Sequence, residues 1–115
     1  MKIRFDVEPP LSGYVVIEIP KPLESIKLTK EMQFKTNEKG EIVEKSDSEK
    51  MEFIFELAEK HCLEVHVETE NGLKIDNFND LGYDEDGRKL IQMIGVKVFT
   101  GVKLSPKSLV QSKHK

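Results

Sequence analysis

Apolar and polar residues alternate at the beginning of the chain, which is the pattern of a half-buried strand. Every second residue from Ile3 to Val7 is apolar, and the residues between them are charged. A β-branched, apolar stretch follows at residues 14–19, after a turn that contains two prolines and a glycine. We therefore predict an antiparallel hairpin of residues 2–8 and 14–19. It must pack on another element, because an isolated hairpin is only marginally stable in water.

A helix is predicted over residues 47–61. Ser46 and Glu49 have the spacing of a capping box, in which each side chain accepts a hydrogen bond from the other residue's backbone N–H. Apolar residues then recur at helical spacing as far as His61.

The segment between these two elements carries mixed signals. Residues 22–35 fit a period of two, but Pro22 suits the first position of a helix and the composition favours helix, so we predict a helix there. Residues 36–46 contain Asn37, Gly40 and many charges, and we predict an exposed loop.

A second, shorter hairpin is predicted after the helix. Residues 64–68 alternate between polar residues and valine, as expected of a strand. Asn71-Gly72 follows, and both residues accept the positive φ that a tight hairpin turn requires. Leu73 and Ile75 supply the return strand.

The last predicted helix begins after Asp84, which can cap its first turn, and Gly101 suits its end. Its apolar residues fit an ordinary core, but the stripe is wide for a chain of this size. Met93, Val96 and Phe99 extend it beyond the core-facing positions, and excess apolar surface is typical of a partner or self-association site. The candidate contact residues are Leu90, Ile91, Met93, Ile94, Val96, Val98 and Phe99.

These elements predict the α+β class: an N-terminal β-hairpin, two to three helices and a second short hairpin around one small core. The chain has 115 residues, the usual size of one compact domain. We expect a single globular domain at residues 1–104 and a flexible basic tail at residues 105–115. We find no internal repeat.

Charge is distributed unevenly along the chain. Lysine and arginine number 18 against 21 acidic residues, a net charge of −3, yet residues 103–115 hold four lysines and no acid. Residues 38–86 hold sixteen acids against five lysines. An acidic middle argues against binding to the phosphate backbone of a nucleic acid.

The chain shows no sign of a membrane or secretory protein. No apolar run approaches the roughly 18 residues of a membrane-spanning helix, and the N-terminus lacks the apolar region of a signal peptide. Cys62 is the only cysteine, so an internal disulfide is excluded. We expect a reducing, cytoplasmic location.

No catalytic, metal or cofactor site can be assembled from the sequence. His61, Cys62 and His66 lack the fourth ligand of a structural zinc site, because His114 lies in the tail. We interpret Cys62 as a buried thiol beside two surface histidines, with no third group to orient a Cys62–His66 pair for nucleophilic catalysis. Residues 76–82 fail the EF-hand pattern and favour turn formation and helix capping. We predict a protein that is not an enzyme and needs no cofactor.

The order of segments resembles the tail assembly chaperones of long-tailed bacteriophages. The similar segments are residues 13–20 (GYVVIEIP), 53–57 (FIFEL), 75–81 (IDNFNDL) and 98–104 (VFTGVKL). The resemblance implies a protein of the host cytoplasm that coats the tape measure protein before the tail tube polymerises around it. It also implies a tape measure or tail tube protein as partner, and a longer, frameshifted form that shares this domain.

Two other interpretations stay open. The first is an acidic inhibitor that occludes a basic protein surface, for which one helix offers Glu49, Glu52, Glu56 and Glu59 on a similar side. The second is a minor structural component of a virion. Self-association through the last helix is compatible with each of them.

Overall fold

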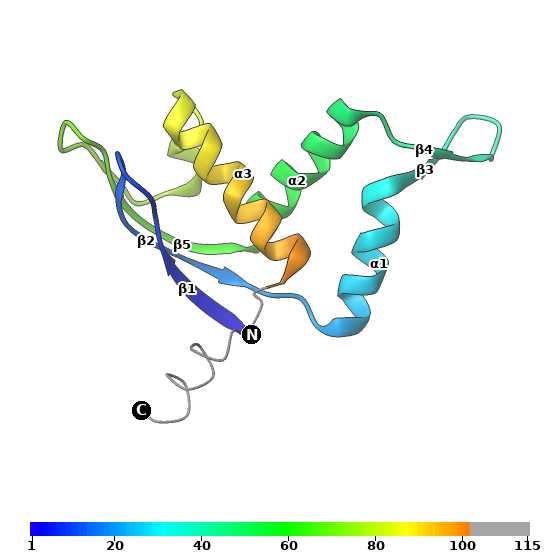
Figure 1. Ribbon diagram of the computed structural model, residues 1–115, viewed down its shortest axis with the longest axis horizontal. Coiled ribbons are helices and arrows are strands. Elements are labelled where there is room, and N and C mark those ends of the chain that lie inside the picture. The colour runs from blue at the N-terminus through cyan, green and yellow to red at the C-terminus, as the bar shows by residue number, and fades with distance from the viewer. Residues whose placement is uncertain (102–115) are drawn as a thin grey trace.

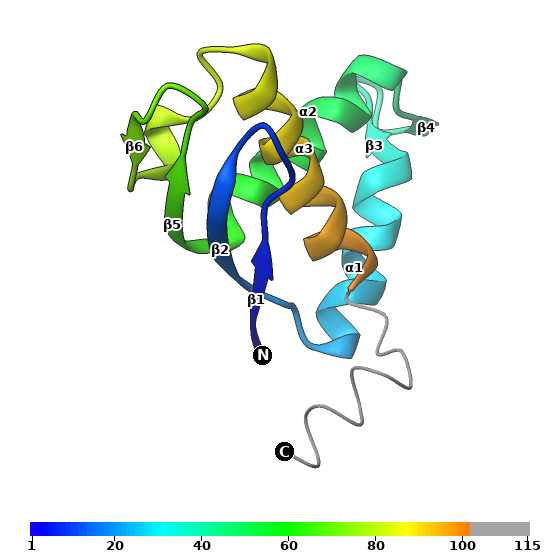
Figure 2. The same cartoon turned by 60° about the vertical axis from the view of Figure 1, so that its left-hand side comes forward.

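Within residues 1–101, a four-stranded antiparallel sheet carries two helices on one of its faces, and a third helix packs against those two (Figure 1, Figure 2). This arrangement comes from a computed structural model, which describes residues 1–101. The sheet has the order β1-β2-β5-β6, with β1 at Lys2–Asp6, β2 at Ser12–Glu18, β5 at Cys62–Glu68 and β6 at Lys74–Ile75. The remaining elements are α1 (Pro22–Gln33), β3 (Phe34–Thr36), β4 (Ile42–Glu44), α2 (Asp47–His61), a 3-10 turn η1 (Phe78–Asp80) and α3 (Glu85–Thr100). The predicted α+β class, with its N-terminal hairpin and second short hairpin, is confirmed.

The sheet buries one face and leaves the other open. In the β1–β2 hairpin, Ile3 pairs with Ile17 and Phe5 pairs with Val15, so the apolar side chains share the face that α2 and α3 cover. Val15 and Ile17 are fully buried, together with Ile94 and Val98 of α3. The core therefore lies between strands β2 and β5 and the two helices.

Helix α2 has the predicted bounds and the predicted cap. The Glu49 N–H donates to Ser46 Oγ at 3.3 Å, and the Ser46 N–H donates to Glu49 Oε1 at 2.9 Å. Its buried stripe ends at His61, which is 8% exposed. The interpretation of His61 as a surface histidine is therefore wrong: it continues the helical spacing of Ile54, Leu57 and Ala58, whereas His66 is exposed on the open face of the sheet.

The segment between the hairpin and α2 is only partly as predicted. The helix predicted over residues 22–35 is confirmed as α1 only as far as Gln33, because Phe34 and Lys35 belong to β3. The predicted loop at 36–46 contains the rest of a small hairpin, in which Lys35 pairs with Val43. Asn37 Oδ1 accepts hydrogen bonds from the N–H groups of Lys39 and Glu41, both at 2.9 Å, and this turn brings β3 and β4 together. Figure 1 shows the hairpin projecting away from the sheet.

The second predicted hairpin is confirmed, with its return strand shifted. Val67 pairs with Ile75, but Leu73 precedes β6 and is 65% exposed. Leu73 belongs to the turn and not to the strand. The Thr69 N–H donates a hydrogen bond to the Leu73 carbonyl and holds Leu73 at the tip of the hairpin.

Helices α2 and α3 approach each other closely at Gly95 of α3, which has no side chain. A Cβ atom added at Gly95 would lie 2.1 Å from the carbonyl oxygen of Ile54 and 2.6 Å from its Cγ2. Because contacts below 3.0 Å are not tolerated, only glycine allows this approach of the two backbones.

We predict that Gly95→Ala lowers the free energy of unfolding by roughly 1–3 kcal/mol, the usual range for overpacking. An exposed helical glycine would behave oppositely, since alanine is the better helix former by about 1 kcal/mol. Urea unfolding of Gly95→Ala checks this, with Gln92→Ala on the exposed side of α3 as the control. A more stable Gly95→Ala protein would contradict the close packing.

Candidate protein-binding surface

The seven apolar candidates on α3 divide into a buried group and a surface group. Four of them belong to the core and are unavailable to a partner: Leu90, Ile91, Ile94 and Val98. The other three reach the surface, where Val96 is 40% exposed and Met93 and Phe99 are half-buried. At about 100° per residue, Val96 lies near the centre of the exposed side of α3, with Met93 and Phe99 on opposite flanks.

A groove lies between this exposed side and helices α1 and α2. Its apolar lining comes from three helices: Met32 of α1, Met51 and Ile54 of α2, and Val96 and Phe99 of α3. Asp47, Lys50 and Gln92 complete the lining, and the open volume is about 710 Å³. We call it the methionine groove.

Sequence reasoning missed the two methionines that give the groove its character. Met51 is 42% exposed in the first turns of α2, and Met32 is half-buried near the end of α1. The periodicity of each helix assigns both to apolar positions, but only the packing of the three helices brings them beside Val96 and Phe99.

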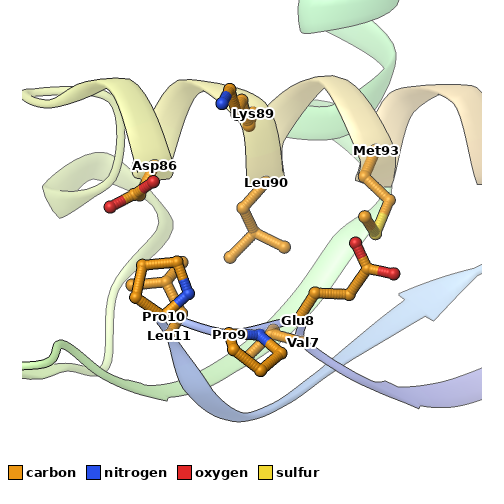
Figure 3. A pocket seen from close by; sticks show the side chains of 9 residues that line it. All are labelled: Val7, Glu8, Pro9, Pro10, Leu11, Asp86, Lys89, Leu90 and Met93. Atoms are coloured by element: carbon orange, nitrogen blue, oxygen red, sulfur yellow. The ribbon is translucent and has the colours of Figure 1, made fainter.

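A second groove follows the opposite flank of α3 and faces the N-terminal hairpin. Figure 3 shows its closed end, where Pro9, Pro10 and Leu11 of the β1–β2 turn lie against Leu90, and Glu8 lies beside Met93. This end has a volume of about 370 Å³ when the open solvent at its mouth is included. It continues along α3 into an open hollow of about 1190 Å³, lined by Glu8, Lys89, Gln92, Met93, Val96, Lys97, Thr100 and Gly101. We call the whole the hairpin-side groove.

The acidic candidates on α2 also differ from one another. Glu52, Glu56 and Glu59 are exposed. Glu49 instead closes the capping box and forms an ion pair with Lys35 of β3. The hydrogen bond from Lys35, followed by those from Ser46, lowers the pKa of Glu49 to about 2. Glu49 therefore holds the β3–β4 hairpin to α2, and three carboxylates remain for a partner.

Cys62 and His66 do not interact with each other, and each has its own partners. The Cys62 thiol donates to the Glu64 carbonyl oxygen at 3.7 Å, and burial raises its pKa to about 11, which disfavours the thiolate. The His66 ring instead lies 2.9 Å from Glu64 Oε1 and packs against Tyr14, with ring centroids 4.8 Å apart.

The described part of the chain contains neither a cluster of metal ligands nor a helix that could span a membrane. Within residues 1–101, no three histidine, cysteine, aspartate or glutamate side chains converge as metal ligands. His114 and the predicted tail at 105–115, like the domain end at residue 104, lie outside the described residues. No helix among residues 1–101 is long and apolar enough to cross a membrane.

The segment that resembles a calcium loop forms turns and caps, as predicted. Asn77 Oδ1 accepts a hydrogen bond from the Asn79 N–H at 2.9 Å and starts η1. Asp84 Oδ1 accepts one from the Gly87 N–H at 2.7 Å and caps α3. These caps fix where α3 begins, and with it the residues that reach the two grooves.

Comparisons with family models, with curated proteins and with solved structures gave no match to this chain.

The environment of Glu49 predicts how stability depends on pH. Its pKa is lowered in the folded state, so its contribution is fully present above the unfolded value of about 4.5 and is lost as pH falls through about 2. We expect Glu49→Gln to be less stable than the wild type at pH 7, and the difference to shrink between pH 4.5 and pH 2.

Thermal unfolding across this pH range measures the difference. Glu52→Gln, on the exposed side of the same helix, is the matched control and should change stability little. A pH-independent difference between the wild type and Glu49→Gln would contradict the assigned ion pair.

Proposed function

We propose that this chain is a protein-binding chaperone without enzymatic activity that covers an amphipathic helical client through α3, as a tail assembly chaperone covers the tape measure protein. The observation that carries the proposal is the methionine groove, an apolar hollow built from α1, α2 and α3.

The shape and chemistry of the groove suit a helical client. An amphipathic helix can lay its apolar stripe into a hydrophobic groove, with contacts spaced at i, i+3, i+4 and i+7. Met32 and Met51 are flexible and polarisable, so the same groove can adapt to different side chains along a long client. Asp47, Lys50 and Gln92 give it a polar margin, as is usual for a protein-binding surface.

The strength of one contact fits a transient chaperone. Full burial of an exposed apolar side chain contributes roughly 1.5–3 kcal/mol, and these side chains are already half-buried, so each adds less. A single groove therefore binds its client weakly. Weak individual contacts also allow release when the tube replaces the chaperone.

The charge of the chain suits the same role. The sixteen acids among residues 38–86 give the surface a net negative field, which opposes aggregation through exposed apolar side chains. The three exposed carboxylates of α2 contribute to this field: Glu52, Glu56 and Glu59.

Co-expression with the tape measure protein of the same genome, followed by affinity retention, tests the proposal. We expect the wild-type chain to retain the client and Val96→Lys to lose most of it, because a lysine would place a charge in the centre of the surface. Leu73→Lys is the matched control, since Leu73 is an exposed apolar residue at the tip of the β5–β6 hairpin.

No retention by the wild type, or equal retention by Val96→Lys, would contradict the proposal. Circular dichroism of both variants shows whether they keep the fold, which we expect because both positions are exposed.

The exposed acids of α2 support a second candidate function, an inhibitor that occludes a basic protein surface. Its binding would weaken steeply with salt, whereas an apolar groove contact would not. A salt titration of any complex that forms separates the two. Loss of binding by Glu52→Lys with Glu56→Lys, while Val96→Lys still binds, would favour the inhibitor.

A further inference from the structure

Strand β1 forms an edge of the sheet along its whole length. It pairs with β2 on one side, and within residues 1–101 no strand pairs with its other side. An unpaired edge presents a row of backbone donors and acceptors that can bind another strand.

The hydrogen bonds at the two ends of the β1–β2 ladder show which residues face the free edge. The Val7 N–H donates to the Gly13 carbonyl at 3.1 Å, and the Ile19 N–H donates to the Met1 carbonyl at 2.8 Å. Hydrogen-bonded pairs alternate with non-bonded pairs in an antiparallel ladder, so the odd-numbered residues of β1 bond to β2. The even-numbered residues direct their N–H and C=O groups outward: Lys2, Arg4 and Asp6.

The charges of these three residues complement those of the same residues in a second copy whose β1 runs antiparallel. In the register centred on Arg4, Lys2 lies opposite Asp6 of the second copy, and Asp6 lies opposite its Lys2. Every outward-facing residue then occupies a hydrogen-bonded pair, and both ends of the seam carry opposite charges. On the helix-covered face, Ile3 meets Phe5 of the second copy and extends the apolar layer.

This register also places Arg4 opposite Arg4 of the second copy. A contact within the single chain reduces the repulsion between these two charges. The Arg4 guanidinium carbon lies 3.7 Å from the centroid of the Tyr14 ring, which belongs to β2. This cation–π contact draws the charge toward β2 and away from the free edge, so two Arg4 side chains need not meet at the centre of the seam.

We propose that two copies of this chain pair through β1 in the antiparallel register that places Lys2 opposite Asp6, forming one continuous sheet with a two-fold axis midway between the two Arg4 residues. The axis is perpendicular to the sheet, so the helices of both copies lie on the same side.

This pairing would also complete the hairpin-side groove. Lys97 of α3 stands over Phe5 of β1, with Nζ 4.9 Å from the ring centroid, so this flank of α3 lies above β1. The hairpin-side groove of each copy then borders the seam, and the two form a single trough with two-fold symmetry. Its role as a longer client site rests on the proposed function, whereas the pairing itself does not.

The pair should be weak and dependent on concentration. Strand β1 has five residues, and such an edge buries far less than the roughly 800 Å² per partner of a standard stable interface. Sedimentation velocity from micromolar to near-millimolar concentration should therefore show a monomer that converts to a dimer. A wild-type chain that remains monomeric, or that forms open-ended polymers, overturns the proposal.

Charge exchange tests the register without disturbing the core. Lys2→Glu and Asp6→Lys each create like-charged pairs at both ends of the seam, and each should weaken dimerisation about tenfold. The double variant Lys2→Glu/Asp6→Lys, and an equimolar mixture of the two single variants, should restore it. Lys27→Glu, the same charge change on the exposed side of α1, is the matched control.

A dimer that is indifferent to these exchanges overturns the register. Client retention is measured separately, so the two proposals fail independently. If the chain stays monomeric but retains its client, only the proposed β1 pairing is contradicted. If it dimerises but retains no client, only the proposed chaperone function is contradicted.

Discussion

The missing side chain at Gly95 sets the distance between α2 and α3, and the rest of the molecule is arranged around that contact. The backbone of α2 at Ile54 occupies the space where any other residue would place its Cβ. This contact fixes the rotation of α3 about its axis. The buried apolar side chains of α3 face the core, Val96 points to solvent, and Met93 and Phe99 lie on the two flanks.

One helix thus serves both the core and the surface. Its buried arc packs on the inner face of β2 and β5, where Val15, Ile17, Ile94 and Val98 are fully buried. Its exposed arc contributes one wall to each of two grooves, and α1, α2 and the N-terminal hairpin contribute the others. A binding surface built on packed helices keeps its shape before the partner arrives, which reduces the ordering cost of weak contacts.

The sequence predicts the elements with strong local signals and misses what depends on distant contacts. The capping box at Ser46 and the Asn71-Gly72 turn act within a few residues, and both hairpins and α2 follow from such signals. The β3–β4 hairpin is missed because each of its strands has only three residues, and the Lys35–Glu49 ion pair that ties it to α2 spans two elements. On α3, helical spacing separates the core residues from Met93, Val96 and Phe99, but cannot place Met32 and Met51 beside them.

The central claim is that a client binds in the methionine groove, and the four methionines of the chain offer a direct test. Methionine methyl NMR spectra of the chain, recorded with and without the tape measure protein, report on each methyl group separately. We predict that the Met32 and Met51 signals shift or broaden when the client is added, while that of Met1, which lines neither groove, stays unchanged. Unchanged Met32 and Met51 signals in the presence of a bound client would contradict the account.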